Sequence, residues 1–236
     1  MNILGVIPAR GGSRSIPRKN IALVAGRPLL QYTCEAALRS KRLTRTILST
    51  DDEEIGSVGR ACGIEVPFLR PDFLAQDETP MVEVLHHAVS WLANHNGFRA
   101  DLIVLLQPTS PLRCAEHIDA AVDLILSTNA DTVVSVVEVP HRFSVVSQMC
   151  KDANGNLSPF IEGPMLLRRQ DKPRLYARNG PVVLVVRRQV IESGRLYGDT
   201  VRPLEMTPTD SLDIDDADDL ALAEFWVNRG RAPRQV

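Results

Sequence analysis

The stretch Ile3-Leu4-Gly5-Val6-Ile7-Pro8-Ala9-Arg10-Gly11-Gly12-Ser13 joins a short apolar run to a glycine-rich basic turn. The run 3–7 is predicted to form a buried strand, because it is apolar throughout and ends at a proline. Glycines and an arginine directly after such a strand are typical of the sheet edge where α/β proteins bind ligands. The stretch therefore predicts where the sheet begins and where a ligand would bind.

Short apolar runs and longer amphipathic segments alternate along most of the chain. Further strands are predicted over 44–49, 64–69, 101–106, 132–137 and 182–187, and helices over 29–38, 52–61, 80–94, 115–126 and 217–228. This alternation predicts an α/β fold in which helices cover both faces of a mostly parallel sheet. The 236 residues suit a single domain. Ligands are expected at the loops 8–20, 49–53, 70–80 and 107–113, which follow strands.

The alternation breaks over 140–180. This region contains prolines at 140, 159, 164 and 173 and an Asn154-Gly155 pair, which signals a turn. We expect short strands, or an excursion from the main layer that serves as an oligomerisation arm.

Composition excludes several classes of protein. The 27 basic and 29 acidic residues give a net charge of −2, which disfavours bulk binding to nucleic acid or to an anionic membrane. No apolar run approaches the roughly 20 residues of a membrane span. Four cysteines occur without a Cys-x-x-Cys pair, and the N-terminal apolar run is too short for a signal peptide. A cytoplasmic protein is therefore expected.

Positive charge is concentrated in the first loop. No Asp or Glu precedes Glu35, whereas five cations do: Arg10, Arg14, Arg18, Lys19 and Arg27. Gly11 and Gly12 allow backbone N–H groups to approach an anion, and Ser13 adds a hydroxyl donor. The loop is a candidate polyphosphate site, with a solvated basic loop as the alternative. The P-loop and G-x-G-x-x-G patterns are absent, which argues against a P-loop NTPase and a dehydrogenase.

Negative charge is concentrated near the other end of the chain, where six of the residues 210–219 are Asp. Asp213 and Asp215 flank Ile214, so both side chains share one face of an extended segment. Two such carboxylates suit Mg²⁺, which also takes phosphate oxygens as ligands. The acids at 216, 218 and 219 are explained instead as the cap and first turn of the last helix.

Two further segments are candidate substrate sites. The loop 107–113 follows the most apolar strand, and its prolines are expected to hold Gln107, Thr109, Ser110 and Arg113 at the edge of the sheet. A capped strand-to-helix turn is the alternative. A second basic patch lies in the excursion and comprises Arg168, Arg169, Gln170, Tyr176, Arg178 and Asn179. It would hold a carboxylate substrate, or it is a solvated face.

Taken in order, these segments resemble the acylneuraminate cytidylyltransferases, also called CMP-sialic acid synthetases. The family's opening motif resembles residues 7–20. Its later motifs resemble Arg70-Pro71 with Leu74-Ala75 and Asp77, then 107–113, then Arg168-Arg169-Gln170, then Asn179-Gly180, then Asp213-Ile214-Asp215. The order and spacing extend over nearly the whole chain, and five motifs in order are specific where any one is weak.

The resemblance implies a Rossmann-like, three-layer nucleotidyltransferase fold and a homodimer in which the excursion 140–180 reaches the neighbour's site. It implies transfer of CMP from CTP to the anomeric hydroxyl of a nonulosonic, sialic-type acid, with Mg²⁺ as cofactor. The implied nucleotide-binding residues are Ala9, Arg10, Gly11, Ser13, Arg14, Lys19, Asn20 and Arg70. The implied substrate-binding residues are Gln107, Ser110, Arg113, Arg168, Gln170, Tyr176 and Asn179. Arg10, Arg14, Lys19 and Asp213 are the expected catalytic residues, and Asp213 and Asp215 the metal ligands.

Two residues depart from the family pattern. Arg14 stands where the family usually has Lys, and Pro181 follows Asn179-Gly180 where an aromatic residue is usual. Other acidic sugars therefore stay open as substrates: legionaminic, pseudaminic or 3-deoxy-octulosonic acid. A non-catalytic nucleotide-binding protein of the same fold is the alternative of another class. The intact pairing of a basic loop with Asp213 and Asp215 argues against it.

Overall fold

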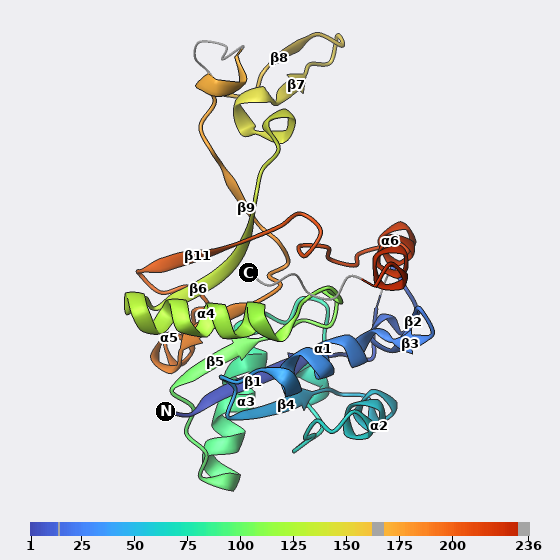
Figure 1. The fold of residues 1–236 in the computed structure, drawn as a ribbon, viewed down its shortest axis with the longest axis vertical. Helices are drawn as coiled ribbons and strands as arrows, with labels where there is room; N and C mark the ends of the chain where they lie inside the picture. Colours follow the sequence, from blue (N-terminus) through green and yellow to red (C-terminus); the bar gives the residue numbers. More distant parts are fainter. Residues whose placement is uncertain (14, 162–167, 231–236) are drawn as a thin grey trace.

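A computed structural model of the chain describes residues 1–13, 15–161 and 168–230. Its central sheet has the strand order β11-β6-β10-β5-β1-β4, and β9 also pairs with β6. The bounds are β1 Ile3–Pro8, β4 Arg45–Ser49, β5 Leu102–Leu105, β6 Thr132–Glu138, β9 Tyr176–Arg178, β10 Leu184–Arg187 and β11 Val201–Met206. Figure 1 shows this sheet at the centre of the body, with helices around it.

The sheet is mostly parallel, as the alternation predicts. β1 pairs in parallel with β4 and β5, and β6 pairs in parallel with β11. β10 runs antiparallel between β5 and β6. The strand predicted over 64–69 is wrong: only two isolated bridges form there, Ile47 with Glu65 and Thr50 with Leu69. Pro67 explains the interruption, because it has no N–H to donate to a ladder.

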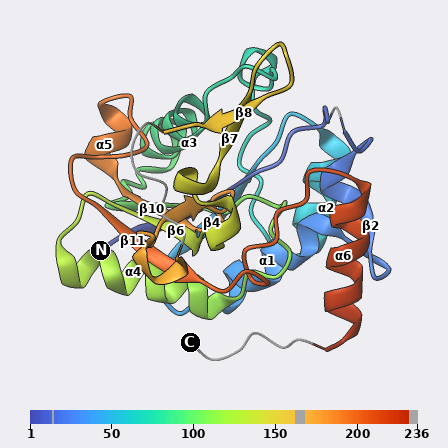
Figure 2. The ribbon, with the colours of Figure 1, turned by 90° about the horizontal axis from the view of Figure 1, so that it is seen from above.

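Helices cover both faces of the sheet and complete two cores. In Figure 2, α1 (Leu29–Arg39) and α4 (Ala115–Thr128) lie on one face, and α3 (Met81–Asn96) and α5 (Arg188–Glu192) on the other. Ile3 and Ile7 of β1 belong to the first core, whereas Leu4 and Val6 belong to the second. This division follows from the alternation of side chains along a strand. The helix α2 (Glu53–Ala61) joins the first core through Ile55.

A third, smaller core holds the two ends of the chain together. The last helix, α6 (Ala217–Asn228), packs against the hairpin of β2 (Leu23–Val24) and β3 (Arg27–Pro28). Val24, Ile214 and Ala223 are buried in this core. It therefore brings the acidic segment near the first loop.

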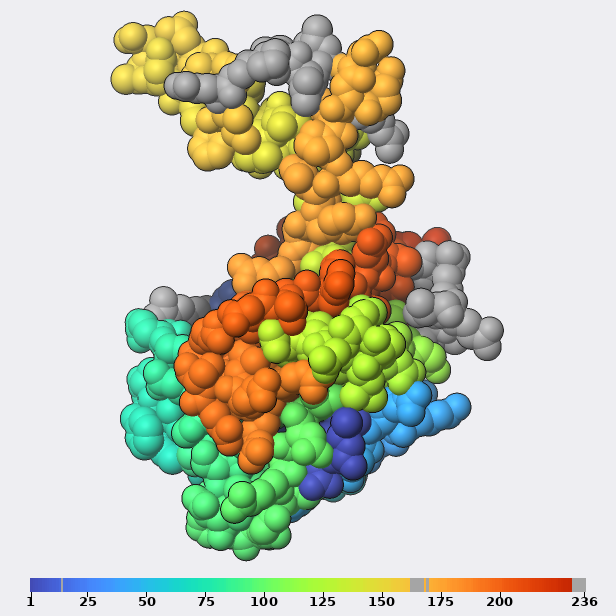
Figure 3. Space-filling view, turned by 90° about the vertical axis from the view of Figure 1, so that its left-hand side faces the viewer, coloured from blue at the N-terminus to red at the C-terminus, as the bar shows by residue number. Residues whose placement is uncertain are grey.

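The predicted excursion is a separate lobe, which we call the arm (residues 140–175). Its described residues, 140–161 and 168–175, contain the hairpin of β7 (Met149–Lys151) and β8 (Leu157–Pro159) and three 3-10 turns, at His141–Phe143, Val145–Ser147 and Arg169–Asp171. Asn154 and Gly155 lie in the hairpin turn, as predicted, and Gly155 has a φ of 88°. Figures 1 and 3 show the arm projecting from the body. The excursion ends at residue 175 and not at the predicted residue 180, because β9 begins at Tyr176 and pairs with the sheet.

Between β9 and β10 the chain leaves the regular pairing with β6. β9 pairs with residues 136–138 of β6, and β10 pairs with residues 132–134. Opposite this step, Ser135 donates to Asn179 Oδ1 at 2.6 Å and accepts from the N–H of Val183 at 3.0 Å. We call residues 179–183 the bulge.

The described helices include none with the length and apolar character of a membrane-spanning segment.

Candidate active site

A cavity of about 300 Å³ opens where β1 and β5 end. Three of the predicted loops meet in it, namely 8–20, 70–80 and 107–113. Arg10, Lys19 and Arg70 line it together with Asn20 and Gln107. Three cations around one small cavity make a site for an anion with several charges.

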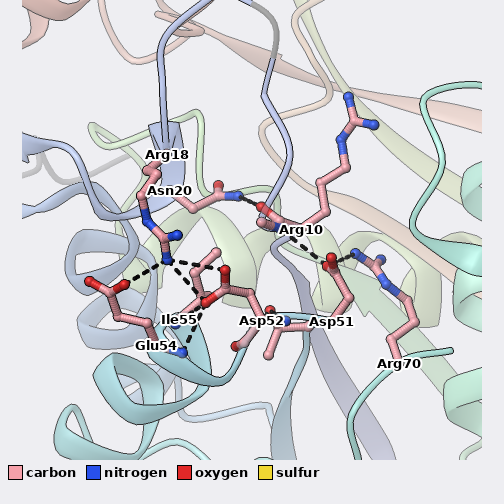
Figure 4. Close-up of polar contacts among 10 residues, drawn as sticks. Arg10, Arg18, Asn20, Asp51, Asp52, Glu54, Ile55 and Arg70 are labelled. Carbon is pink, nitrogen blue, oxygen red and sulfur yellow. Dashed lines mark hydrogen bonds and ion pairs between the residues drawn. The ribbon is translucent and has the colours of Figure 1, made fainter. Parts of the chain in front are cut away.

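The backbone of the first loop is held from behind by polar side chains. Asn20 is buried, and its side-chain amide donates to the carbonyl of Arg10 at 2.8 Å. Asp51 accepts from the N–H of Gly11 at 3.1 Å and from Arg70 at 3.3 Å (Figure 4). Burial lowers the pKa of Arg70, and the charge of Asp51 opposes that shift. Asp51 was not among the predicted site residues, although the loop 49–53 follows a strand.

Gly11 and Gly12 differ in how much space surrounds them. A Cβ at Gly11 would lie 2.8 Å from Asp52 Oδ2, whereas a Cβ at Gly12 would meet open space. Asp52 cannot easily move, because it caps α2 by accepting from the N–H groups of Glu54 and Ile55 at 2.9 and 3.0 Å. The prediction that both glycines present N–H groups to an anion is therefore revised. The N–H of Gly11 is bonded to Asp51, and only Gly12 of the two lines the cavity.

The cations of the loop point in different directions. Arg10 forms an ion pair with Asp77, and both line the cavity. Arg18 instead turns to α2, where it bonds to both carboxylate oxygens of Asp52 at 3.1 Å and lies 2.9 Å from Glu54 Oε2 (Figure 4). Arg14 lies outside the described residues. Ser13 lines the cavity, and Ala9 is buried and continues the pairing of β1 with β4.

Lys19 joins the basic loop to the acidic segment. Its Nζ donates to the carbonyl of Ile214 at 2.8 Å and lies 3.9 Å from Asp215 Oδ1. Ile214 is fully buried, and its N–H donates to the carbonyl of Thr109 at 2.9 Å. The segment is thus fixed between the first loop and the 107–113 loop. Charges that are almost 200 positions apart in the sequence meet in one place.

The two predicted metal ligands differ in their surroundings. Asp213 Oδ1 is buried and accepts no hydrogen bond from any described residue. Burial raises the pKa of Asp213, the hydroxyl of Thr109 opposes that shift, and the neighbouring charge of Asp215 adds to it. The side chain of Asp215 is 85% exposed. An unpartnered buried carboxylate oxygen beside a second carboxylate fits Mg²⁺, which takes one or two carboxylates plus oxygens of a substrate.

The other acids of this segment have the structural role that was predicted. Asp216 accepts from the N–H groups of Asp218 and Asp219 at 2.9 and 3.0 Å, which caps α6. The side chain of Asp219 accepts in return from the N–H of Asp216. This reciprocal capping box satisfies donors at the helix start and leaves Asp213 and Asp215 as the metal candidates.

The residues predicted to contact substrate fall into three groups. Gln107 lines the cavity, and its amide lies 3.5 Å from the carbonyl of Gly180. Ser110 and Arg113 are buried in the protein, so the structure gives them supporting positions instead of direct contact. Asn179 is also buried, and its amide donates to Ser211 at 2.7 Å while its oxygen accepts from Ser135. It holds the bulge in place.

The third group belongs to the arm and its base. Arg168 is exposed and bonds to Asp171 at 2.7 Å, and Tyr176 is exposed on β9. Gln170 lines a separate hollow at the base of the arm, with Glu138 and Glu205. None of the three lines the cavity of its own chain. The structure therefore does not bring these three residues to the cavity of the chain that carries them.

A basic loop that faces paired aspartates at the carboxyl edge of a mostly parallel sheet defines an α/β protein that handles a nucleoside polyphosphate. The family described as "Cytidylyltransferase" matches residues 4–201, and the chain belongs to that family.

Relatives of known name agree with this assignment. The chain is 36% identical to CMP-N,N'-diacetyllegionaminic acid synthase of Legionella pneumophila over 95% of both chains. It is 32% identical to the N-acylneuraminate cytidylyltransferase of Escherichia coli over 94% of its own length, but spans only 51% of that protein. It is 28% identical to the pseudaminic acid cytidylyltransferase of Campylobacter jejuni over 95% of its own length and 96% of that protein. The chain thus spans about half the length of the N-acylneuraminate enzyme.

Solved structures agree in fold. A CMP:2-keto-3-deoxy-manno-octonic acid synthetase complexed with CTP superposes with a TM-score of 0.71 over 97% of this chain and 99% of the other, at 16% identity. A 4-diphosphocytidyl-2C-methyl-D-erythritol synthase from Anaerococcus prevotii superposes with a TM-score of 0.65 over 97% and 96%, at 13% identity. At such identities the likeness concerns the fold alone.

Proposed function

We propose that this chain transfers CMP from CTP to the anomeric hydroxyl of a nonulosonic acid and releases pyrophosphate. One observation carries the proposal: Lys19 bonds to the segment of Asp213 and Asp215 at the same cavity that Arg10 and Arg70 line. Cations for a triphosphate and carboxylates for a metal therefore lie side by side. The names of the relatives support a cytidine nucleotide and an acidic sugar.

The reaction needs alignment and charge neutralisation more than a strong base. The oxygen of the anomeric hydroxyl forms a bond to the α-phosphorus and gives up its proton to solvent. The bond from that phosphorus to the bridging oxygen breaks, and pyrophosphate leaves. Arg10 and Lys19 would stabilise the departing charge, and Asn20 and Arg70 would face the cytidine end. Mg²⁺ bound at Asp213 and Asp215 would neutralise charge on the α-phosphate.

The sugar acid would lie near Gln107, next to the bulge. Residues of a second copy would close the site, so we propose a homodimer. The arm supports this proposal, because it projects from the body and exposes large apolar side chains, among them Phe143, Leu157 and Phe160 at 58–63%. Several exposed apolar side chains on one projecting segment are typical of an interaction surface.

Legionaminic- and pseudaminic-type acids are the favoured nonulosonic substrates. The chain covers 95–96% of the relatives named for those two sugars but about half of the N-acylneuraminate enzyme of Escherichia coli. We also propose a reducing, cytoplasmic location. All four cysteines are free, and the thiols of Cys34 and Cys62 are hydrogen-bonded to one another without being joined.

The test is a pyrophosphate-release assay with CTP, Mg²⁺ and a panel of acids: N-acetylneuraminic, legionaminic, pseudaminic and 3-deoxy-octulosonic. We expect release with one of the first three. Calorimetric titration with CTP runs in parallel. CTP binding without pyrophosphate release for any acid would indicate a non-catalytic nucleotide-binding protein. Absence of both CTP binding and pyrophosphate release would refute the proposal.

The metal assignment is tested in the same assay by titrating Mg²⁺. Asp213→Asn and Asp215→Asn keep the side-chain size but remove the charge, so both should lower the rate and raise the Mg²⁺ midpoint. Asp218→Asn is the matched control, since it should cost at most about 1 kcal/mol of helix stability and leave turnover near normal. Wild-type rates and midpoints in both site variants would refute the assignment.

A further inference from the structure

Arg113 is a buried cation behind the cavity. Its side chain donates to the carbonyls of Val182 at 2.6 Å and Gln107 at 2.8 Å and to the hydroxyl of Thr33. Only 4% of the residue is exposed, and no described carboxylate forms an ion pair with it. Burial lowers the pKa of Arg113 to about 9, and Asp213 is the carboxylate that opposes this shift.

One of these three partners, Gln107, lines the cavity, and a second, Val182, belongs to the bulge that contacts Gln107. Gln107 begins the loop after β5, and Val182 belongs to the bulge between β9 and β10. The side chain of Gln107 in turn lies 3.5 Å from the carbonyl of Gly180 in that bulge. Because a guanidinium is planar and its donors have fixed directions, its bonds set the separation of the two segments.

The bulge also lies against Asp213. A Cβ on Gly180 would lie 3.4 Å from the carboxyl carbon of Asp213 and from its Oδ2, so the two residues are already in close packing. The bulge is therefore packed between Asp213 on one side and Gln107 on the other.

A contribution to stability alone does not explain why an arginine is buried at position 113. Burying a cation carries a desolvation penalty, and apolar residues of similar volume often replace a buried charge without loss of stability. The bonds to backbone carbonyls give Arg113 a geometric role that an apolar side chain would lack. Direct contact with substrate is also a poor explanation, because the side chain is enclosed and its terminal nitrogens are already bonded inside the protein.

We propose that Arg113 is a positioning residue for the sugar-acid half of the site. It fixes the distance between Gln107 and the bulge, and it leaves the triphosphate half unaffected. That half is built on Arg10 and Lys19, neither of which bonds to Arg113 in the described part of the chain. The inference rests on the proposed function, because it assigns the sugar to Gln107.

The experiment compares Arg113→Met and Arg113→Lys with wild type. We measure kcat, the KM for the sugar acid that turns over fastest, the KM for CTP, and calorimetric CTP binding without sugar. Displacement of substrate-positioning groups by an ångström can cost about 100-fold, so Arg113→Met should lower kcat/KM for the sugar by about 10- to 100-fold. The KM and the dissociation constant for CTP should stay within about twofold. Arg113→Lys keeps one charged donor and should recover part of the loss.

Thr33→Val is the control, because it removes the bond of Arg113 to α1 and leaves the bonds to the two site segments. It should lower the melting temperature and leave the sugar KM unchanged. Equal losses for CTP and sugar in both arginine variants, or unchanged kinetics, would overturn the inference. If Arg113→Met does not fold, the same comparison of the sugar constants with the CTP constants is made for Arg113→Lys. Absence of turnover in wild type would instead refute the proposed function.

Discussion

Arg10 forms an ion pair with Asp77, and both side chains line the cavity that is proposed to hold a triphosphate. The described lining of this cavity contains no other carboxylate. An internal carboxylate is therefore already paired with a cation that would bind phosphate. Both side chains are about one-third exposed, and separating an ion pair of that kind costs only about 0–1 kcal/mol. A phosphate can displace Asp77 at small cost.

Asp77→Asn should strengthen the binding of inorganic pyrophosphate by about 3- to 5-fold, since about 1 kcal/mol of competing interaction is removed. Calorimetric titration at a fixed, low salt concentration measures this effect. Asp72→Asn, in the same segment but away from the cavity lining, is the control and should bind as wild type does. Weaker binding by Asp77→Asn would mean that Asp77 orients Arg10 for the phosphate instead of competing with it.

The two glycines of the first loop allow a matched comparison. Gly11→Ala places a methyl group 2.8 Å from Asp52 Oδ2, where Asp52 is committed to capping α2. Overpacking of this kind costs about 1–3 kcal/mol, so the melting temperature and the rate should both fall. Gly12→Ala adds its methyl group in open space and should leave the melting temperature nearly unchanged. Equal melting temperatures for the two variants would show that the crowding at Gly11 relaxes freely.

Local signals in the sequence were sufficient for the elements that are regular and buried. The run 3–7 is apolar and ends at Pro8, and it forms β1. Asp216 precedes two acids at the start of the segment 217–228, and it caps α6. The strand β11 (Val201–Met206) was not predicted, because it is an edge strand with a proline at 203 and little buried surface, so it carries no apolar pattern.

Partners that are distant along the chain could not be predicted from local patterns. The charges of Lys19 and Asp215 suggest attraction, but the bond of Lys19 to the carbonyl of Ile214 depends on how α6 packs against β2. Arg113 has the sequence context of an exposed loop arginine, and only the tertiary structure shows that it is enclosed. Asp51 and Asp77 follow predicted strands or belong to a family motif, yet their pairing with Arg70 and Arg10 required the fold.

The proposed dimer predicts that one charge on the arm separates the subunits. Leu157→Glu places a carboxylate at a side chain that is 63% exposed on β8, and burying an unpaired charge in an interface is strongly unfavourable. We expect a monomer in sedimentation, with loss of most of the CTP-dependent pyrophosphate release.

Ser158→Glu is the control for this variant. It adds the same charge at the next residue, whose side chain points to the opposite face of the hairpin. It should remain a dimer and stay active. A fully active Leu157→Glu monomer would show that the arm does not complete a neighbour's site.

The surroundings of Asp213 predict how stability depends on pH when no metal is added. Burial raises the pKa of this carboxyl in the folded protein above its ordinary value. The folded state therefore holds the proton more tightly than the unfolded state does. Stability from this group is fully present below the ordinary pKa and is lost as pH rises through the raised pKa. The side chain introduced by Asp213→Asn carries no charge at any pH, so the variant does not lose this stability as the pH rises.

The melting temperature of Asp213→Asn should therefore exceed that of wild type by more at about pH 8 than at about pH 4, because the ordinary pKa of Asp is about 3.9. Differential scanning calorimetry in a chelating buffer measures both proteins at each pH. All other titrating groups are shared by the two proteins, so their contributions cancel to first order. Asp218→Asn, at the exposed start of α6, should show no such growth with pH. A difference between Asp213→Asn and wild type that is the same at both pH values would show that the Asp213 carboxyl is solvated like an ordinary surface acid.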